Sequence, residues 1–131
     1  MPDSSFGVFL KLVTAAITAF WIGVNPTLQL LFIFVILDYG TGVGAAIVEG
    51  KVSSEIGFKG ITKKVILLIL TFSIQLIEPY IDSQIIDLPV SLTAAVAGFY
   101  IANEGISILE NVQRAGLPVP EFLTRIFSRI K

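Results

Sequence analysis

The sequence of 131 residues contains neither cysteine nor histidine. Disulfides, zinc sites made of cysteine and histidine, serine–histidine triads and cysteine nucleophiles are therefore excluded together. No Walker or dinucleotide-binding glycine motif occurs in it, and no loop has the ligand spacing of a magnesium or calcium site. We therefore expect a protein that is not an enzyme and that uses no metal or cofactor.

Charged residues are scarce as well. They make up 15% of the chain, whereas soluble domains carry about a quarter. The net charge of −1 provides no basic surface for nucleic acid. Hydrophobic residues reach 54%, and the mean hydropathy is +0.86. Because long apolar runs alternate with short charged patches, the pattern indicates an integral membrane protein made of helices rather than a soluble domain.

Four apolar segments have the length that a helix needs to cross the hydrocarbon layer, roughly 20 residues. Pro26 separates the first two segments, and Pro89 separates the last two. A charged loop over residues 49–64 lies between the second and third, and a polar tail covers residues 110–131. The sequence thus predicts a single all-α membrane domain over residues 1–131. The predicted spans are residues 6–24, 27–48, 65–86 and 90–109.

The first segment is the least certain span because it is short and carries Lys11. An apolar run after a lysine also resembles a signal peptide, but the run continues from Trp21 to Val24, so we expect the segment to be retained. An interfacial first helix followed by three spans is the alternative to four spans.

The distribution of lysine and arginine predicts the orientation, because short basic loops stay on the cytoplasmic side. The loop at 49–64 and the tail are basic, whereas the turn at Asp87 has no lysine or arginine. We therefore expect the loop and the C-terminus in the cytoplasm. The basic residues are Lys51, Lys59, Lys63 and Lys64 in the loop and Arg114, Arg125, Arg129 and Lys131 in the tail.

The end of the tail has the pattern of an amphipathic helix. Its apolar residues recur at helical spacing, while Arg125 and Arg129 lie on the other side. Such a helix is suited to the anionic inner surface of the membrane, and a solvated tail is the alternative. The apolar residues are Leu123, Ile126, Phe127 and Ile130.

Several polar residues interrupt the predicted spans. Glu78 and Asp82 lie nearer the outer end of the third segment, and three others are the candidates for a function. Asp38 lies about 16 Å into the second segment at 1.5 Å per residue, near the membrane midplane. Asn103 and Glu104 lie in the inner half of the fourth segment. A carboxylate at the centre of a span costs about 3 kcal/mol, so residues of this kind often have a function. The alternative is that they only join helices through hydrogen bonds.

Each carboxylate needs a partner, a proton or water. Glu104 is close enough to the inner surface for Lys63 or Lys64 to reach it. Asp38 has no basic residue at its own predicted depth. We expect it to be protonated, exposed to water in an assembled pore, or hydrogen-bonded to Tyr39, Thr41 or Asn103.

Small residues recur at a spacing of four in several spans, and such rows allow helices to associate closely in membranes. Their presence on more than one helix predicts contacts both within and between subunits, and therefore a homo-oligomer in the bilayer. The residues concerned are Gly40 and Gly44 in the second span, and Ala94, Gly98 and Ala102, with Gly105 on a neighbouring face, in the fourth.

Short motifs follow one another between residues 34 and 121. They read LDYGTG at 37–42, GFKGI at 57–61, FYIANEG at 99–105 and GLPVP at 116–120. In order and spacing these motifs resemble the phage lysis and toxin-secretion holins of Gram-positive bacteria and their phages. The positions that match the family pattern are Asp38, Gly40, Thr41, Gly42, Lys59, Gly60, Asn103, Glu104 and Gly105.

The resemblance implies a function without covalent chemistry or catalytic residues. A holin accumulates in the cytoplasmic membrane of the bacterial host and then self-assembles into large pores at a set time. An endolysin, or a toxin for related proteins, passes through without requiring direct contact, and an antiholin is a further partner. We hypothesise that Asp38 and Glu104 are protonated or bonded before triggering and line water afterwards.

Two other functions fit the same residues. In a small ion- or proton-coupled transporter or channel, Asp38 and Glu104 would be coupling sites, although the chain shows no internal repeat. In an antiholin-like regulator, the chain would bind a membrane partner and open no pore.

Overall fold

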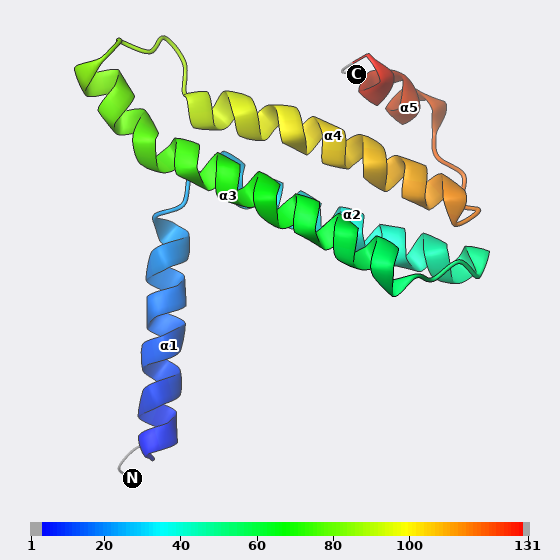
Figure 1. The fold of residues 1–131 in the computed structure, drawn as a ribbon, viewed down its shortest axis with the longest axis horizontal. Helices are drawn as coiled ribbons and strands as arrows, with labels where there is room; N and C mark the ends of the chain where they lie inside the picture. Colours follow the sequence, from blue (N-terminus) through cyan, green and yellow to red (C-terminus); the bar gives the residue numbers. More distant parts are fainter. Residues whose placement is uncertain (1–3, 130–131) are drawn as a thin grey trace.

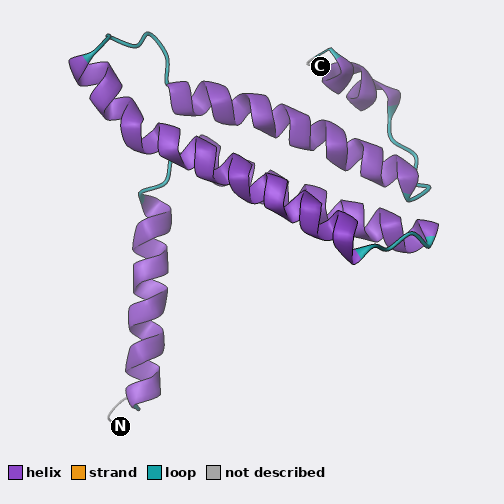
Figure 2. Cartoon of the chain, viewed as in Figure 1, coloured by secondary structure: helices purple, strands orange, loops and turns teal. Residues whose placement is uncertain are grey.

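The computed structural model describes residues 4–129, and these residues form five helices joined by short connections (Figures 1 and 2). The side chain of Phe127, together with Ile130 and Lys131, lies outside the described part of the chain. The helices are α1 (Ser5–Ile22), α2 (Pro26–Glu49), α3 (Ser54–Gln84), α4 (Leu92–Arg114) and α5 (Glu121–Ser128).

Helices α1 to α4 are each long and apolar enough to cross a membrane. The eight-residue α5 is too short to span and is strongly amphipathic. The predicted fold class, an all-α membrane protein with four spans and a C-terminal amphipathic helix, is confirmed.

Local sequence signals explain where the helices begin. The Asn25 side chain accepts a hydrogen bond from the backbone N–H of Thr27 at 2.9 Å, and Pro26 occupies the first position of α2. Ser53 and Ser91 cap α3 and α4 in the same way. Gly50, with φ of 67°, ends α2 in the left-handed conformation that favours glycine.

The prediction of a loop over residues 49–64 is wrong from Ser54 onward. Helix α3 already begins there, so Lys59, Gly60, Lys63 and Lys64 lie on a helix. The Ser53 cap and an ion pair of 2.9 Å between Lys59 and Glu55 stabilise these first turns. With 31 residues, α3 is about 46 Å long and exceeds the hydrocarbon thickness of roughly 30 Å. The polar first turns of α3 can therefore lie outside the hydrocarbon layer.

Helices α2, α3 and α4 form a bundle in which α2 and α4 make the most extensive contact. An apolar core fills the half of this bundle nearest the α1–α2 and α3–α4 connections. Phe72 and Leu68 of α3 and Tyr100 of α4 pack against it. The buried members of the core are Val24, Leu28, Leu31, Val35 and Ala97.

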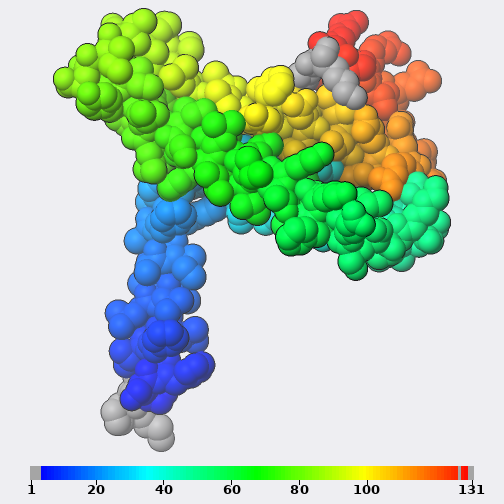
Figure 3. All heavy atoms as spheres, in the orientation of Figure 1, coloured from blue at the N-terminus to red at the C-terminus, as the bar shows by residue number. Residues whose placement is uncertain are grey.

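Helix α1 leaves the bundle crosswise and has no buried residue (Figures 1 and 3). Polar contacts fix this direction. The Gln75 side chain accepts a bond from the backbone N–H of Asn25 at 2.8 Å and donates to the Gly23 carbonyl at 3.3 Å. Gln29 donates to the Trp21 carbonyl at 2.7 Å. The C-terminal end of α1 is thus hydrogen-bonded to α2 and α3, while the rest of α1 is exposed and can contact lipid or another subunit.

Candidate functional site: an ion cluster between three helices

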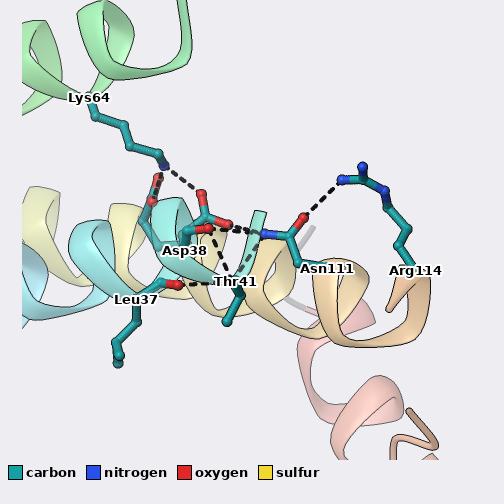
Figure 4. Close-up of polar contacts among 7 residues, drawn as sticks. Leu37, Asp38, Thr41, Lys64, Asn111 and Arg114 are labelled. Atoms are coloured by element: carbon teal, nitrogen blue, oxygen red, sulfur yellow. Dashed lines mark hydrogen bonds and ion pairs between the residues drawn. The ribbon is translucent and has the colours of Figure 1, made fainter. Parts of the chain in front are cut away.

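Asp38 of α2, Lys64 of α3 and Glu104 of α4 meet in the bundle and are named here the ion cluster (Figure 4). The Lys64 ammonium donates to Asp38 Oδ2 at 2.5 Å and to Glu104 Oε2. The exposed fractions of the three side chains are only 11%, 18% and 9%, in chain order. One ammonium thus joins all three helices.

Both carboxylates lie near the middle of their helices, whereas Lys64 lies in the first third of α3. The long lysine side chain reaches from there toward the centre (Figure 4). A lysine side chain can do this because its four-carbon stem can lie along apolar surface while its ammonium reaches a polar site several ångströms away.

Asn111 extends the ion cluster along α4. Its Nδ2 donates to Asp38 Oδ1 at 2.8 Å, to the Asp38 carbonyl at 3.1 Å and to Thr41 Oγ1 at 3.2 Å. A Cβ at Gly42 would lie 3.4 Å from this amide nitrogen, at ordinary van der Waals distance. Asp38, Thr41 and Gly42 of the LDYGTG segment therefore all lie against one side chain of α4.

A second ion pair joins the ends of α2 and α4. Arg114 donates from Nε and Nη2 to Glu49 Oε1 and Oε2, at 3.2 and 2.8 Å, in a two-bond fork. Its Nη1 also donates to Asn111 Oδ1 at 3.1 Å. Asn111 and Arg114 therefore connect the ion cluster to the end of α4 (Figure 4).

The prediction that Lys63 or Lys64 reaches Glu104 is confirmed for Lys64. The prediction that Asp38 has no basic residue at its depth is wrong, because Lys64 bonds to it as well. Its carboxylate bonds to Asn111 rather than to Tyr39, Thr41 or Asn103. The prediction allowed a lysine side chain to reach Glu104 but placed Asp38, by its depth along its own helix, beyond that reach.

The sequence reasoning missed Asn111, although a signal was present. Asn111 follows Glu104 by seven residues, which is two helical turns, so the two residues share one face of α4. Asn103 lies on a neighbouring face and is half-buried. Spacing along α4 therefore favoured Asn111 over Asn103 as the partner of a residue on α2.

The small residues divide into two groups. Gly105 is buried in the bundle, and Ala94 and Ala102 are half-buried. Gly40 and Gly44 are exposed, and no described atom outside their own helix lies within 4 Å of a Cβ built on either. Gly98 also has open space beside it. The role of Gly40, Gly44 and Gly98 in helix packing therefore stays a prediction about contacts between subunits.

The predicted basic surface residues lie apart from the ion cluster. Lys59 and Lys63 are exposed on α3, and Gly60 between them is half-buried. Arg125 and Arg129 are exposed at the C-terminal end. These positions can meet lipid headgroups or another molecule without disturbing the bundle.

A cavity of about 770 Å³ lies between α2, α3 and α4 at the end where the 50–53 loop joins α2 to α3. Asp38, Lys64 and Asn111 line its deep end, and Lys51 and Arg114 lie at its mouth. Its walls are largely apolar and are formed in part by Tyr39, Val43, Phe58 and Ile61. The ion cluster therefore borders space that opens at one end of the bundle.

Residues 15–131 of the chain match the bacteriophage holin family. The chain belongs to this family. The match includes the whole ion cluster and both ends of the bundle, but it omits the first ten residues of α1. Family membership establishes a multi-pass membrane protein with a holin role and no enzymatic activity.

Individual relatives agree with the family assignment. A probable holin of Bacillus phage phi105 is 35% identical over 106 residues, which cover 81% of this chain and 75% of the phage protein. An uncharacterized protein of Halalkalibacterium halodurans is 39% identical over 104 residues, or 79% and 77% of the two chains. An uncharacterized 14.9 kDa protein of Clostridium perfringens is 36% identical over 100 residues, or 76% and 73%. No solved structure matches the chain significantly.

Proposed function

We propose that this holin self-assembles in the bacterial cytoplasmic membrane into large pores that release an endolysin or a toxin and so time lysis of the cell. The observation that carries the proposal is the ion cluster, which joins the middles of α2 and α4 to Lys64 of α3 in a holin-family chain. A chain of 131 residues is too small to enclose a wide pore alone, so the pore requires several copies.

In the proposed mechanism the ion cluster holds the closed bundle. While Lys64 pairs with Asp38 and Glu104, the ammonium and both carboxylates have hydrogen-bond partners inside the protein. When α3 moves away from α2 and α4, the same charges need water, and a water-filled pore between subunits supplies it. The exposed Gly40 and Gly44 provide a surface of α2 for close contact with another copy.

The membrane potential is a suitable trigger on energetic grounds. A charge that crosses the whole field changes its free energy by about 2.3 kcal/mol per 100 mV. This is comparable to the cost of about 3 kcal/mol for a carboxylate at the centre of a span. If one or two charges per subunit move, an oligomer sums their effects and opens steeply.

The proposed orientation places the 50–53 loop and the C-terminus in the cytoplasm, following the basic residues near both. Helix α5 contacts α4, and Arg125 in α5 and Arg129 directly after it are exposed. It is therefore suited to lie against the anionic inner surface of the membrane.

Inducible expression in a bacterium, with and without a cytoplasmic endolysin, tests the function. We expect a delay, then an abrupt loss of membrane potential, with lysis only when the endolysin is present. A gradual ion leak without lysis would instead indicate a transporter or channel. Continued growth with an intact potential would indicate an antiholin-like regulator or another non-pore role.

A further inference from the structure

The charges of the ion cluster do not balance. It contains two carboxylates and one ammonium, and its hydrogen-bond partners Asn111 and Thr41 are neutral. With all three groups ionised, one negative charge would remain inside the bundle near the middles of α2 and α4, where an unbalanced carboxylate is costly. A buried carboxylate avoids this cost by binding a proton.

Neighbouring charges do not remove the excess. Glu49 and Arg114 form their own pair at the mouth of the cavity. Lys51 and Glu110 are of opposite charge, so the remaining charged lining is also balanced. The other titratable groups that line the cavity are Tyr39 and Glu49 from α2, Lys51 from the loop, and Glu110 and Arg114 from α4.

The surroundings allow protons to arrive from one direction. The cavity extends from the 50–53 loop to Asp38 and Lys64. On the other side of the ion cluster, the bundle is filled by the apolar core, in which Leu31 and Ala97 are fully buried. Water therefore has space beside the ion cluster on the loop side. A second hollow, at the α1–α2 and α3–α4 connections, is lined by no residue of the ion cluster.

We propose that the closed bundle holds one proton, shared between Asp38 and Glu104, which enters and leaves through the cavity on the side of the 50–53 loop. Asp38, Lys64 and Glu104 then carry no net charge while the helices are together. This site is defined by the closed bundle alone. The further step, that opening the bundle releases the proton, rests on the proposed pore function.

The direction of the pH effect follows from proton counting. The closed bundle binds one proton more than an open state in which both carboxylates face water. Raising the pH on the loop side therefore favours opening, and lowering it favours the closed bundle. In cells, the loop side is the cytoplasm if the proposed orientation holds.

Infrared spectroscopy of the purified protein in lipid bilayers tests the proton site directly, through the C=O stretch of a protonated carboxylic acid. Ordinary carboxyl groups are ionised near neutral pH. We expect the wild type to show an acid band there, and we expect both Asp38→Asn and Glu104→Gln to lose it. Either substitution leaves one carboxylate paired with Lys64, which is a neutral pair.

Glu78→Gln is the matched control, because Glu78 caps α4 at the other end of the bundle and is not in the ion cluster. This variant should keep the acid band. Absence of the band in the wild type near neutral pH would overturn the proposal, as would its persistence in both cluster variants.

Single cysteines test the access route, since the native chain has none. Ser107 lines the cavity, whereas Ser73 is exposed on the outside of α3. In sealed vesicles, a charged thiol reagent should modify Ser107→Cys from one side only, and this should be the side that modifies Lys51→Cys in the loop. Ser73→Cys should be unreactive from both sides.

Equal reaction of Ser107→Cys from both sides, or from neither, would overturn the one-sided route. None of these measurements requires pores or an endolysin. A failed lysis experiment would therefore contradict the proposed function and leave the proton site standing. A missing acid band would contradict the proton site and leave the proposed function standing.

Discussion

The two halves of the α2–α3–α4 bundle are held together in different ways. Near the α3–α4 connection, Leu28, Leu31 and Ala97 form a core without charge. Beyond Val35, the bundle contains the ion cluster and a cavity beside it, although Ala45 is still fully buried there. Apolar packing is non-directional and tolerates small shifts, whereas an ion cluster breaks when one partner leaves. We therefore expect the bundle to open from the half that contains the ion cluster.

Two glutamates show the same contrast. Glu78 accepts bonds from the backbone N–H groups of Leu92 and Thr93, at 2.7 and 3.0 Å, at the start of α4. A helix N-terminus suits a carboxylate there, so Glu78 completes a connection between consecutive helices. Glu104 instead depends on a lysine from another helix. The first contact survives separation of α2 from the bundle, whereas the second is part of what holds the three helices together.

Lys64→Gln is expected to have the largest effect, because it leaves Asp38 and Glu104 without their shared ammonium. Removing one partner of a buried ion pair costs about 3–5 kcal/mol. We expect a lower free energy of unfolding in detergent by that order and earlier lysis in cells. Lys63→Gln is the control, since the neighbouring lysine is exposed. Equal unfolding curves for the two variants would contradict a holding role for the ion cluster.

Leu31→Ala is expected to have the next largest effect. Leu31 is fully buried, and large-to-small changes in a packed core cost about 2–5 kcal/mol. We expect a cost at the low end of this range, because lipid tails are as apolar as the protein core. Leu30→Ala is the control, because Leu30 is 44% exposed. The Leu31 variant should unfold at lower denaturant concentration and keep the infrared acid band. Loss of that band would show that the two halves are not independent.

Much of the fold could be predicted from local signals. The Asn25–Pro26 boundary, the Ser53 and Ser91 caps and the turn at Gly50 are all properties of a few consecutive residues. Hydropathy likewise predicted four segments of spanning length. The early start of α3 was missed because hydropathy alone does not register a capped, ion-paired first turn that extends beyond the hydrocarbon.

The ion cluster could be predicted only in part. The depth of Asp38 and Glu104 follows from the sequence, and so does a contact from Lys63 or Lys64 to Glu104, which Lys64 makes. That Lys64 also reaches Asp38, and that Asn111 completes the site, depends on how three helices are shifted relative to one another. The crosswise direction of α1 depends on Gln75, which lies 50 residues from its partner Asn25. No local pattern contains this information.

Asp38→Asn is expected to have a smaller effect than Lys64→Gln. The variant keeps a neutral pair between Lys64 and Glu104, and the new amide still accepts a hydrogen bond from Asn111. It should insert into the membrane normally but change the lysis time and remove the pH dependence of triggering. Membrane content by immunoblot and lysis curves at different cytoplasmic pH values provide the test. Unchanged timing would count against a triggering role for this carboxylate.

Arg114→Gln is expected to have the smallest effect of the four. The Arg114 side chain is 47% exposed, and an exposed ion pair is weakened by water and by salt. The substitution chiefly removes the two-bond fork to Glu49. We therefore expect a slight loss of stability at low salt that disappears at high salt.

Arg125→Gln is the control for this prediction, because its pair with Glu121 lies at 3.7 Å between largely exposed side chains. Unfolding of the two variants at low and high salt provides the comparison. If Arg114→Gln destabilised the bundle as much as Lys64→Gln, independently of salt, the mouth of the cavity would be the main contact between α2 and α4. The expected opening would then start at the helix ends, and the ion cluster would separate only afterwards.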